Sequence, residues 1–417
     1  MDNIAQLLAH NDADLSFQRA FYEDLHEHPE LSGQESETSA KVIDQLKRFD
    51  CEVIAPVGGF GVVAVFRNGE GPCALFRSDM DALPVKEETG VDYASTRVRP
   101  RSDGSMTGVM HACGHDMHMT ALMGACAILD ANRDAWHGTF IAIFQPSEEN
   151  SKGANAMISD GLTARVPRPD VCFGQHIVAG PAGEVQTMPG AQLAACDSIR
   201  ITVYGRSSHG SMPQRAIDPT YIAAMIVVRL QGIVGREVAP DDFAVITVGS
   251  LHSGTTNNII PDKAELILNC RFFCDDTKKR VYSAIRRVVN AECQASNSPK
   301  EPEFEFFAHG ELVDNSPEVY AEVRPNFDAV FGKRSVDAER WSASEDFSNI
   351  PHAFHAPYMF WTVGCTPQKV WDDAVAAKAV DTSVPTNHQA GFLPDFEPTA
   401  QATTRAAAAA LLTCLGR

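Results

Sequence analysis

The 417-residue chain has no long hydrophobic run, few basic side chains and no extended low-complexity tract. No stretch approaches the roughly 18 uninterrupted apolar residues of a membrane-spanning helix, so we expect no membrane partner. Its first residues contain no basic segment followed by an apolar run, and we therefore expect no secretory signal peptide. Only 35 basic side chains stand against 54 acidic ones, a formal net charge of −19. This balance argues against a nucleic-acid partner, because phosphate binding needs clustered Lys and Arg.

Paired cysteine motifs are also absent. The eleven cysteines are scattered at irregular spacings, which is not the pattern of a disulfide framework. We expect most of them to be small core residues of a protein in a reducing cytoplasm. Hydrophobic side chains make up 44% of the sequence and charged ones 21%, so there is ample material for a folded core. The length suggests about two or three domains.

Strand-like and helix-like segments alternate along much of the chain, which favours an α/β fold with helices packed over a parallel or mixed central sheet. Short apolar runs predict strands, and apolar residues on one helical face predict helices. The expected strands are 61–66, 73–76, 139–144, 171–176 and 359–363, and the expected helices are 36–49, 120–129 and one from about 398.

The middle of the chain has a different pattern. Its expected strands are 198–204, 243–251 and 264–273, and its expected helices are 216–233 and 277–294. This β-α-β-β-α order fits a small two-layer α+β domain. We therefore predict one discontinuous α/β domain, formed by residues 1–190 and 306–417, interrupted by an inserted domain of residues 191–305.

The densest group of metal-binding side chains is the segment 111–118, HACGHDMH. A Cys-x-His pair on a glycine-containing turn can bring the sulfur of Cys113 and a nitrogen of His115 to the same cation. Asp116 can either cap the following helix or accept an N–H from a ligating imidazole. The alternatives are a helix cap followed by core histidines, or a structural zinc site. Closed zinc sites usually combine elements such as Cys-x-x-Cys, which the chain lacks.

Two adjacent glutamates, Glu148 and Glu149, directly follow the expected strand 139–144. Adjacent side chains at a strand end diverge, so one carboxylate can ligate a cation while its neighbour faces a bound water. Metal-assisted hydrolysis requires this combination of a Lewis acid and a base. His176, at the end of another expected strand, and His388, in a loop, are further candidate ligands.

A further pair of carboxylates, Asp79 and Asp81, alternates along the chain close to the end of an expected strand. Side chains two residues apart in a strand share one face. These two carboxylates are therefore placed to orient the metal ligands from behind.

These segments together closely resemble the M20 metallopeptidase family, in the amidohydrolase branch that includes N-acyl-amino-acid, hippurate and auxin-conjugate hydrolases. They run nearly the whole length of the chain in family order. The matching segments are SDMDALP (78–84), GVMHACGHDMHMT (108–120), FQPSEE (144–149), GQHI (174–177), SSHGSMP (207–213), NNIIPD (257–262), SEDFS (344–348) and NHQAGFLPDFEP (387–398).

The resemblance implies a catalytic domain with a binuclear metal site and an inserted lid or dimerisation domain, and hence a homodimer or higher homo-oligomer. It implies two divalent ions per chain. Thiolate and imidazole favour zinc, carboxylates also accept manganese, and cobalt and nickel fit the same donors. The implied ligands are Cys113, which would bridge the ions, with His115, Glu149, His176 and His388.

The remaining roles also come from the resemblance. Glu148 would be the general base, and His209 would stabilise an oxyanion or grip the substrate, in its own subunit or across a dimer interface. Asn258 would hold the substrate carboxylate. The supporting residues around the site would be Asp81, Asp116 and Glu345.

The implied reaction is hydrolysis of the amide bond of N-acyl amino acids or related small amides. A carboxypeptidase or dipeptidase of the same family is an alternative, and a non-catalytic metal-binding protein is another, although that protein would be expected to lack the base or a ligand. Two segments depart from the family pattern: residues 178–181 are VAGP, and Gln389-Ala390 follow the last histidine. The ligands stay intact, but the identity of the substrate does not transfer.

Overall fold

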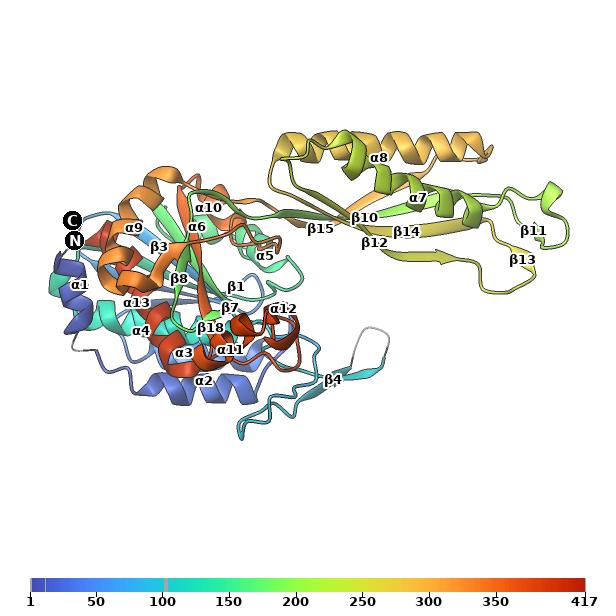
Figure 1. Cartoon of the computed structure of the whole chain (residues 1–417). Helices are drawn as coiled ribbons and strands as arrows, with labels where there is room; N and C mark the ends of the chain where they lie inside the picture. The colour runs from blue at the N-terminus through green and yellow to red at the C-terminus, as the bar shows by residue number, and fades with distance from the viewer. Residues whose placement is uncertain (1, 12, 101–103, 417) are drawn as a thin grey trace. The chain divides into compact units, whose positions relative to one another are not determined.

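A computed structural model describes residues 2–11, 13–100 and 104–416, and the chain forms two compact units (Figure 1). The larger unit contains Met1–Gln192, Asp314–Glu339 and Asp346–Arg417, and the smaller unit contains Leu193–Val313 and Arg340–Glu345. The insert expected from the sequence spans 191–305, whereas the smaller unit continues to Val313. Within the described residues, no helix combines the length and apolar character needed to cross a bilayer.

The larger unit is built on a mixed sheet, as expected from the alternation of segments. The strand order is β1-β2-β6-β3-β7-β18-β8-β17. Strands β6, β3, β7 and β18 run parallel to one another, and antiparallel neighbours flank them. The strand bounds are β1 (Glu52–Val57), β2 (Gly61–Asn68), β3 (Cys73–Asp79), β6 (Gly138–Gln145), β7 (Val171–Pro181), β8 (Val185–Thr187), β17 (Ser335–Asp337) and β18 (Tyr358–Thr366).

The central strands are buried on both sides, because helices cover the sheet. Every residue of β3 and β18 is buried, which explains their continuous apolar runs. Helices α4 (His115–Ala131) and α13 (Phe396–Leu415) pack against each other and against β3 and β7. The alanines at 406–410 are fully buried, and their short side chains permit close packing.

The larger unit contains further helices (Figure 1). They are α1 (Asp2–Ala9), α2 (Phe17–Glu27), α3 (Ser36–Leu46), α5 (Gly153–Ser159), α6 (Leu162–Arg165), α9 (Pro317–Phe331), α10 (Asn349–Phe354), α11 (Gln368–Ala376) and α12 (Val380–Ser383). The short strands β4 (Val98–Pro100) and β5 (Met106–Gly108) form a hairpin, and β9 (Gly190–Leu193) pairs with β16 (Val313–Asn315).

The smaller unit is a two-layer α+β structure. Its antiparallel sheet has the order β12-β14-β10-β15. Alternate residues of β14 are buried, so one face of the sheet packs against the helices. Its elements are β10 (Ala195–Tyr204), α7 (Pro219–Glu237), β12 (Ala244–Ser253), β14 (Lys263–Phe272), α8 (Asp275–Ala295) and β15 (Glu303–Gly310).

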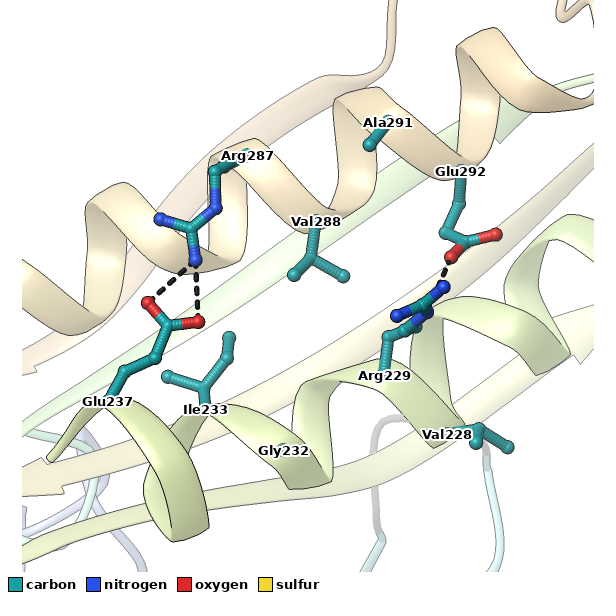
Figure 2. Close-up of a pocket in the computed structure, with 9 residues that line it drawn as sticks. All are labelled: Val228, Arg229, Gly232, Ile233, Glu237, Arg287, Val288, Ala291 and Glu292. Carbon is teal, nitrogen blue, oxygen red and sulfur yellow. Dashed lines mark hydrogen bonds and ion pairs between the residues drawn. The ribbon is translucent and has the colours of Figure 1, made fainter.

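Ion pairs join the outer faces of helices α7 and α8 (Figure 2). Arg287 Nη2 lies 2.5 Å and 2.6 Å from the two carboxylate oxygens of Glu237, and Arg229 Nε lies 3.1 Å from Glu292 Oε1. Between these pairs lies a pocket of about 490 Å³ with an apolar floor that includes Ile233. The exposed ion pairs contribute little to stability, roughly 0–1 kcal/mol each.

The predicted strands and helices named above are confirmed, but β15 and α9 were not expected. The side chains of β15 do not alternate cleanly between buried and exposed, and its pairing with β10 shifts between Cys196 and Ser198. A bulge of this kind breaks the period-2 pattern on which strand prediction depends. Helix α9 has Pro325 in its interior, which is an unfavourable signal for a helix.

Candidate metal centre

The site lies where parallel strands of the larger unit end side by side. Asp79 closes β3 directly opposite Gln145, which closes β6. In the neighbouring β7, His176 comes two residues after Gly174, the last residue that pairs with β3. The carboxyl ends of adjacent parallel strands share one edge of the sheet, which is where open α/β folds bind ligands.

The turn that carries Cys113 and His115 depends on the glycine between them. Gly114 has a φ of +79°, a left-handed conformation that other residues adopt at a cost. A Cβ atom at this position would lie 2.3 Å from Ile177 Cδ1. Helix α4 begins immediately afterwards, at His115. The glycine therefore lets the turn press against β7, which brings Cys113 close to His176.

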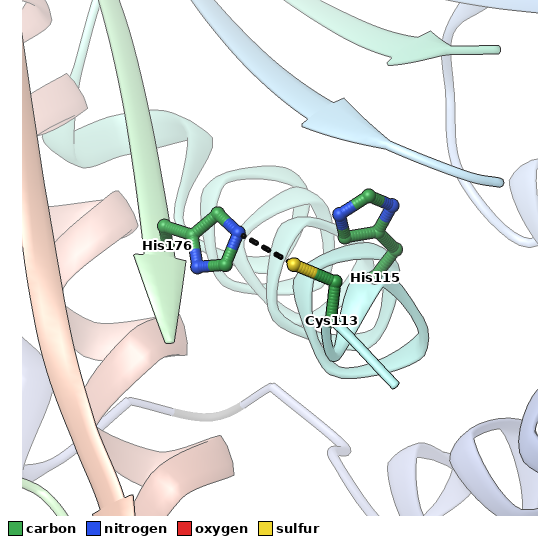
Figure 3. A group of neighbouring side chains, drawn as sticks. All are labelled: Cys113, His115 and His176. Atoms are coloured by element: carbon green, nitrogen blue, oxygen red, sulfur yellow. Dashed lines mark hydrogen bonds between the residues drawn. The ribbon is translucent and has the colours of Figure 1, made fainter. Parts of the chain in front are cut away.

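The five residues that the resemblance implies as ligands lie together. Cys113 Sγ is 3.3 Å from His176 Nε2 and 3.3 Å from His388 Nε2 (Figure 3 shows Cys113, His115 and His176). Glu149 Oε1 is 3.7 Å from His115 Nε2, and Glu149 Oε2 is 3.4 Å from His388 Nε2.

These donors form two overlapping groups within the described residues. One group is Cys113, His115 and His176, and the other is Cys113, Glu149 and His388; in each group the candidate ligand atoms lie within 4.8 Å of one another. Cys113 belongs to both groups. His115 and Glu149 also form a further candidate group with Glu148.

Backbone contacts orient the two histidines that come from outside the Cys113 turn. The Nδ1–H of His176 donates to the carbonyl oxygen of Ile177 at 2.7 Å, which leaves its Nε2 directed at Cys113 as an acceptor. His388, in the loop before α13, has a φ of +71° and donates its backbone N–H to Ala112 O at 2.7 Å. The loop is thus tied to the same turn as the thiol.

Charge and burial favour a cation at this site. Both ring nitrogens of His115 and Glu149 Oε1 are buried and have no hydrogen-bond partner among the described residues. Burial alone would lower the pKa of His115, but the carboxylates of Asp79, Asp81 and Glu149 outweigh it and raise that pKa to about 10. The surrounding carboxylates thus stabilise a positive charge at this position, and they would stabilise the larger charge of a divalent ion more strongly.

The protonation of the other donors fits the same conclusion. Burial raises the pKa of Glu149 to about 7, against the lowering effect of His115. Burial, reinforced by Glu149 and Glu148, holds the pKa of the Cys113 thiol well above its usual range, and a bound cation would favour the thiolate form. Thiolate, imidazole and carboxylate together suit a borderline-soft ion such as zinc.

Asp81 accepts hydrogen bonds from the backbone of the glutamate pair. Its Oδ1 accepts the backbone N–H of Glu148 at 3.0 Å, and its Oδ2 accepts the N–H of Glu149 at 3.1 Å and the hydroxyl of Ser32 at 2.6 Å. Asp81 Oδ1 also lies 3.4 Å from His115 Nδ1. One buried carboxylate thus contacts both the candidate base segment and a candidate ligand.

Asp116 has a different set of contacts. It accepts a hydrogen bond from His26 Nδ1 at 2.7 Å and from the backbone N–H of Met117 at 2.8 Å. His26 also contacts Glu87 Oε1 through Nε2, at 3.0 Å. Burial would lower the pKa of His26, but its hydrogen bonds to the two carboxylates raise it to about 10. Asp116 therefore links α2 to the start of α4.

Glu345, the other predicted supporting residue, belongs to the smaller unit and is buried.

A buried ionic network behind the site was not foreseen from the sequence. Arg77, about 1% exposed, donates to Asp79 at 2.8 Å, to Gln145 at 2.9 Å and to Asp346 at 2.9 Å. His118 Nδ1 contacts Asp79 at 2.6 Å, while its Nε2 accepts the N–H of Ile177 at 2.9 Å. Both nitrogens of His118 are thus engaged by protein groups, so it orients β7 rather than offering a ligand atom.

The smaller unit holds the other two predicted site residues side by side. Strands β11 (Ser208–His209) and β13 (Ile259–Ile260) pair, with His209 opposite Ile259, and the N–H of Gly210 donates to Asn258 O at 2.7 Å. The N–H of Ser211 donates to His209 Nδ1 at 3.1 Å. A neutral His209 ring therefore carries its proton on Nε2, as a donor on an exposed side chain.

Known proteins are similar to this chain. The profile of "Peptidase family M20/M25/M40" matches residues 75–382. The chain belongs to this family of metal-dependent amidohydrolases and peptidases, within its amidohydrolase branch.

Three similar proteins show the range of the family. Thermostable carboxypeptidase 2 of Saccharolobus solfataricus is 35% identical, covering 83% of this chain and 85% of its own. Hippurate hydrolase of Campylobacter jejuni is 36% identical over 81% of this chain and 85% of its own. A solved Bacillus subtilis structure, described as a dinuclear metal binding peptidase from the M20 family, has a TM-score of 0.76 at 27% identity, covering 96% of this chain and 98% of its own.

Proposed function

We propose that this protein hydrolyses the amide bond of N-acyl amino acids or related small amides. The observation that carries the proposal is the pair of donor groups that share Cys113, with Glu148 directly beside them. Similarity to a hippurate hydrolase supports an acylated amino acid as the substrate class. We propose that two divalent ions are held by Cys113, His115, Glu149, His176 and His388.

The donor set favours zinc, and manganese, cobalt and nickel are the alternatives. Divalent ions in such sites supply Lewis acidity, which lowers the pKa of water and polarises a carbonyl group.

Side chains of the protein carry out proton transfer, oxyanion stabilisation and substrate binding. Glu148, buried and with Oε2 3.9 Å from His115 Nε2, takes a proton from the attacking water. It later delivers that proton to the leaving amine nitrogen, so that one water is consumed and a carboxylate and an amine are released. His209 donates its Nε2–H to the developing oxyanion, a contribution of about 10²–10³ in rate for such donors. Asn258 binds the carboxylate of the substrate.

Glu148→Gln tests the assignment of the base. The glutamine keeps the shape of the side chain but accepts no proton, so we expect turnover to fall by about 10²–10⁴. Metal content should stay at the wild-type value, because the proposed ligand is the neighbouring Glu149. Glu149→Gln is the matched comparison and should lose metal as well as activity. Wild-type turnover in Glu148→Gln would disprove the role of the base.

A substrate panel tests the reaction class. The chain is also similar to a carboxypeptidase, which favours peptides as the second candidate. N-acyl amino acids and dipeptides of matched side chains should be compared at equal metal loading. We expect faster hydrolysis of the acylated compounds. Cleavage of the dipeptides alone would assign the chain to the peptidases.

The assembly and the compartment are also proposals. We propose a homodimer or higher homo-oligomer formed through the smaller unit, in whose described sheet β12 is an edge strand able to pair with another chain. A cytoplasmic location is supported by the eleven cysteines, which form no disulfide among the described residues. Sedimentation velocity tests the first proposal, and a single species with the mass of one chain would contradict it.

A further inference from the structure

A buried carboxylate that the mechanism does not use lies next to the glutamate pair. Glu35 precedes α3 and is completely buried. Its Oε1 accepts the backbone N–H of Ser147 at 2.8 Å and that of Gly33 at 2.9 Å, and the hydroxyl of Ser147 lies 3.4 Å away. Within the part of the chain that the structure describes, its Oε2 has no hydrogen-bond partner. Burial raises the pKa of Glu35 to about 7.

The residue that Glu35 holds has a strained backbone. Ser147 has a φ of +55°, in the left-handed region that residues with a Cβ avoid. It directly precedes Glu148 and Glu149, so its conformation sets the direction in which the chain leaves β6. Such strained residues persist only where the surrounding structure holds them.

Three consecutive backbone N–H groups in this segment are bound by carboxylates. Glu35 accepts from Ser147, and Asp81 accepts from Glu148 and Glu149. Hydrogen bonds to an ionised acceptor are stronger than neutral ones, and those to a buried group are costly to lose. The peptide planes of the three residues are fixed by these bonds, and the peptide planes determine where the two glutamate side chains point.

Glu35 is itself presented by an anchored turn. The carboxylate of Glu30 accepts the N–H of Thr38 at 2.7 Å and its hydroxyl at 2.9 Å, which fastens the turn to α3. The carbonyl of Glu30 accepts the N–H of Ala82 at 2.8 Å, next to Asp81. The carboxylates of Glu35 and Asp81, which bind the backbone of residues 147–149, are therefore held by segments that are hydrogen-bonded to each other.

We propose that Glu35 is a positioning residue for hydrolysis, which holds Ser147 in its left-handed conformation and so aims Glu148 at the water and Glu149 at the metal. The inference rests on the proposed function for the roles of those two glutamates. Glu35 does not touch the reacting atoms, and its effect is transmitted through the backbone of Ser147.

Kinetics of Glu35 variants test the inference. Glu35→Ala should lower kcat by about 10²-fold with little change in KM, because misplacement of a catalytic group by about 1 Å costs that much. Glu35→Gln keeps an acceptor oxygen for Ser147 and should retain most of the rate. Asp197→Asn is the control: it changes a buried carboxylate of the smaller unit that accepts hydrogen bonds from Tyr282 and His309, and its kcat should stay within about twofold of wild type.

A rescue experiment separates positioning from general stabilisation. Glycine adopts the left-handed conformation without a steric cost, so adding Ser147→Gly to Glu35→Ala should recover about tenfold in kcat. A residue that acts only on stability would show no such recovery. If Glu35→Ala does not fold, Glu35→Asp withdraws the acceptor by one methylene and supports the same comparison.

Hydrogen exchange gives a readout that depends on neither substrate nor metal. In the metal-free protein, Glu35→Ala should accelerate amide exchange in the peptide containing Ser147 by about tenfold or more, because its N–H loses its partner. A wild-type protein inactive on every acylated substrate would defeat the proposed function and leave this result intact. Wild-type exchange and kcat in Glu35→Ala, or a lowered kcat that Ser147→Gly does not recover, would overturn the inference.

Discussion

Replacement of Asp81 by asparagine probes the link between folding and metal binding. The carboxylate of Asp81 receives the backbone N–H groups of Glu148 and Glu149 and the hydroxyl of Ser32. Asparagine keeps one acceptor oxygen for Glu148, but its NH₂ group then faces the N–H of Glu149. The substitution therefore replaces a buried hydrogen bond by two opposed donors.

The expected magnitude follows from these contacts. A hydrogen bond to a charged group contributes about 1.5–3 kcal/mol, and a buried donor left without a partner costs about 1–3 kcal/mol. We expect Asp81→Asn to lower the free energy of unfolding by about 2–4 kcal/mol, since the hydroxyl of Ser32 can turn to accept from the new NH₂. The charge 3.4 Å from His115 Nδ1 is also lost, and removal of such a partner typically weakens metal binding about 10- to 100-fold.

The assay combines guanidinium unfolding of the metal-free protein with a zinc titration against a competing chelator. Asp197→Asn provides the control, because Asp197 is a buried carboxylate of the smaller unit that receives hydrogen bonds from Tyr282 and His309. The control should lose stability while keeping its zinc affinity. Zinc affinity of Asp81→Asn within threefold of wild type would refute the argument that Asp81 orients His115.

Three further results are expected. Carboxylate partners outweigh burial and raise the pKa of His26 from 6.5 to about 10. The stabilising effect of His26 is therefore complete below about pH 6.5 and is lost as the pH rises through 10. Urea unfolding should show that the free energy of unfolding falls over this interval, and that it falls less steeply in His26→Gln. Arg77→Met removes the guanidinium group that pairs with the buried Asp79 and Asp346 and should cost about 3–5 kcal/mol of unfolding free energy, whereas a loss below about 1 kcal/mol would contradict the network. Gly114→Ala places a Cβ 2.3 Å from a neighbouring side chain and should lower both the melting temperature and zinc loading, measured by calorimetry and elemental analysis.

Most residues of the proposed site could be predicted from the sequence. Cys113 and His115 stand in a short motif, and Glu149 and His176 follow apolar runs whose carboxyl ends meet at one sheet edge. His388 could be named as a candidate from the sequence, but its place in the ligand set came from the family resemblance, because a histidine in a loop carries no periodic signal. Its backbone bond to Ala112 shows why the loop reaches the site.

Asp81 and Asp116 could be named as supporting residues, but Arg77 and Glu35 could not, because their partners are distant in the sequence. Arg77 bonds to Asp346, 269 residues away, and Glu35 bonds to Ser147, 112 residues away. From the sequence alone, an arginine or glutamate that becomes buried cannot be distinguished from one at the surface, because its partner is known only from the fold. Strand β15 escaped prediction for a local reason, since its bulge disrupts the alternation of buried and exposed side chains.

X-ray absorption at the zinc edge of the reconstituted protein tests the shared thiolate most directly. We predict a sulfur shell at about 2.3 Å in the wild-type protein, together with nitrogen and oxygen ligands at about 2.0–2.2 Å. In Cys113→Ser the sulfur shell should disappear. A wild-type spectrum that contains only nitrogen and oxygen ligands, or a sulfur shell that survives in Cys113→Ser, would contradict the proposal that Cys113 lies at the centre of the metal site.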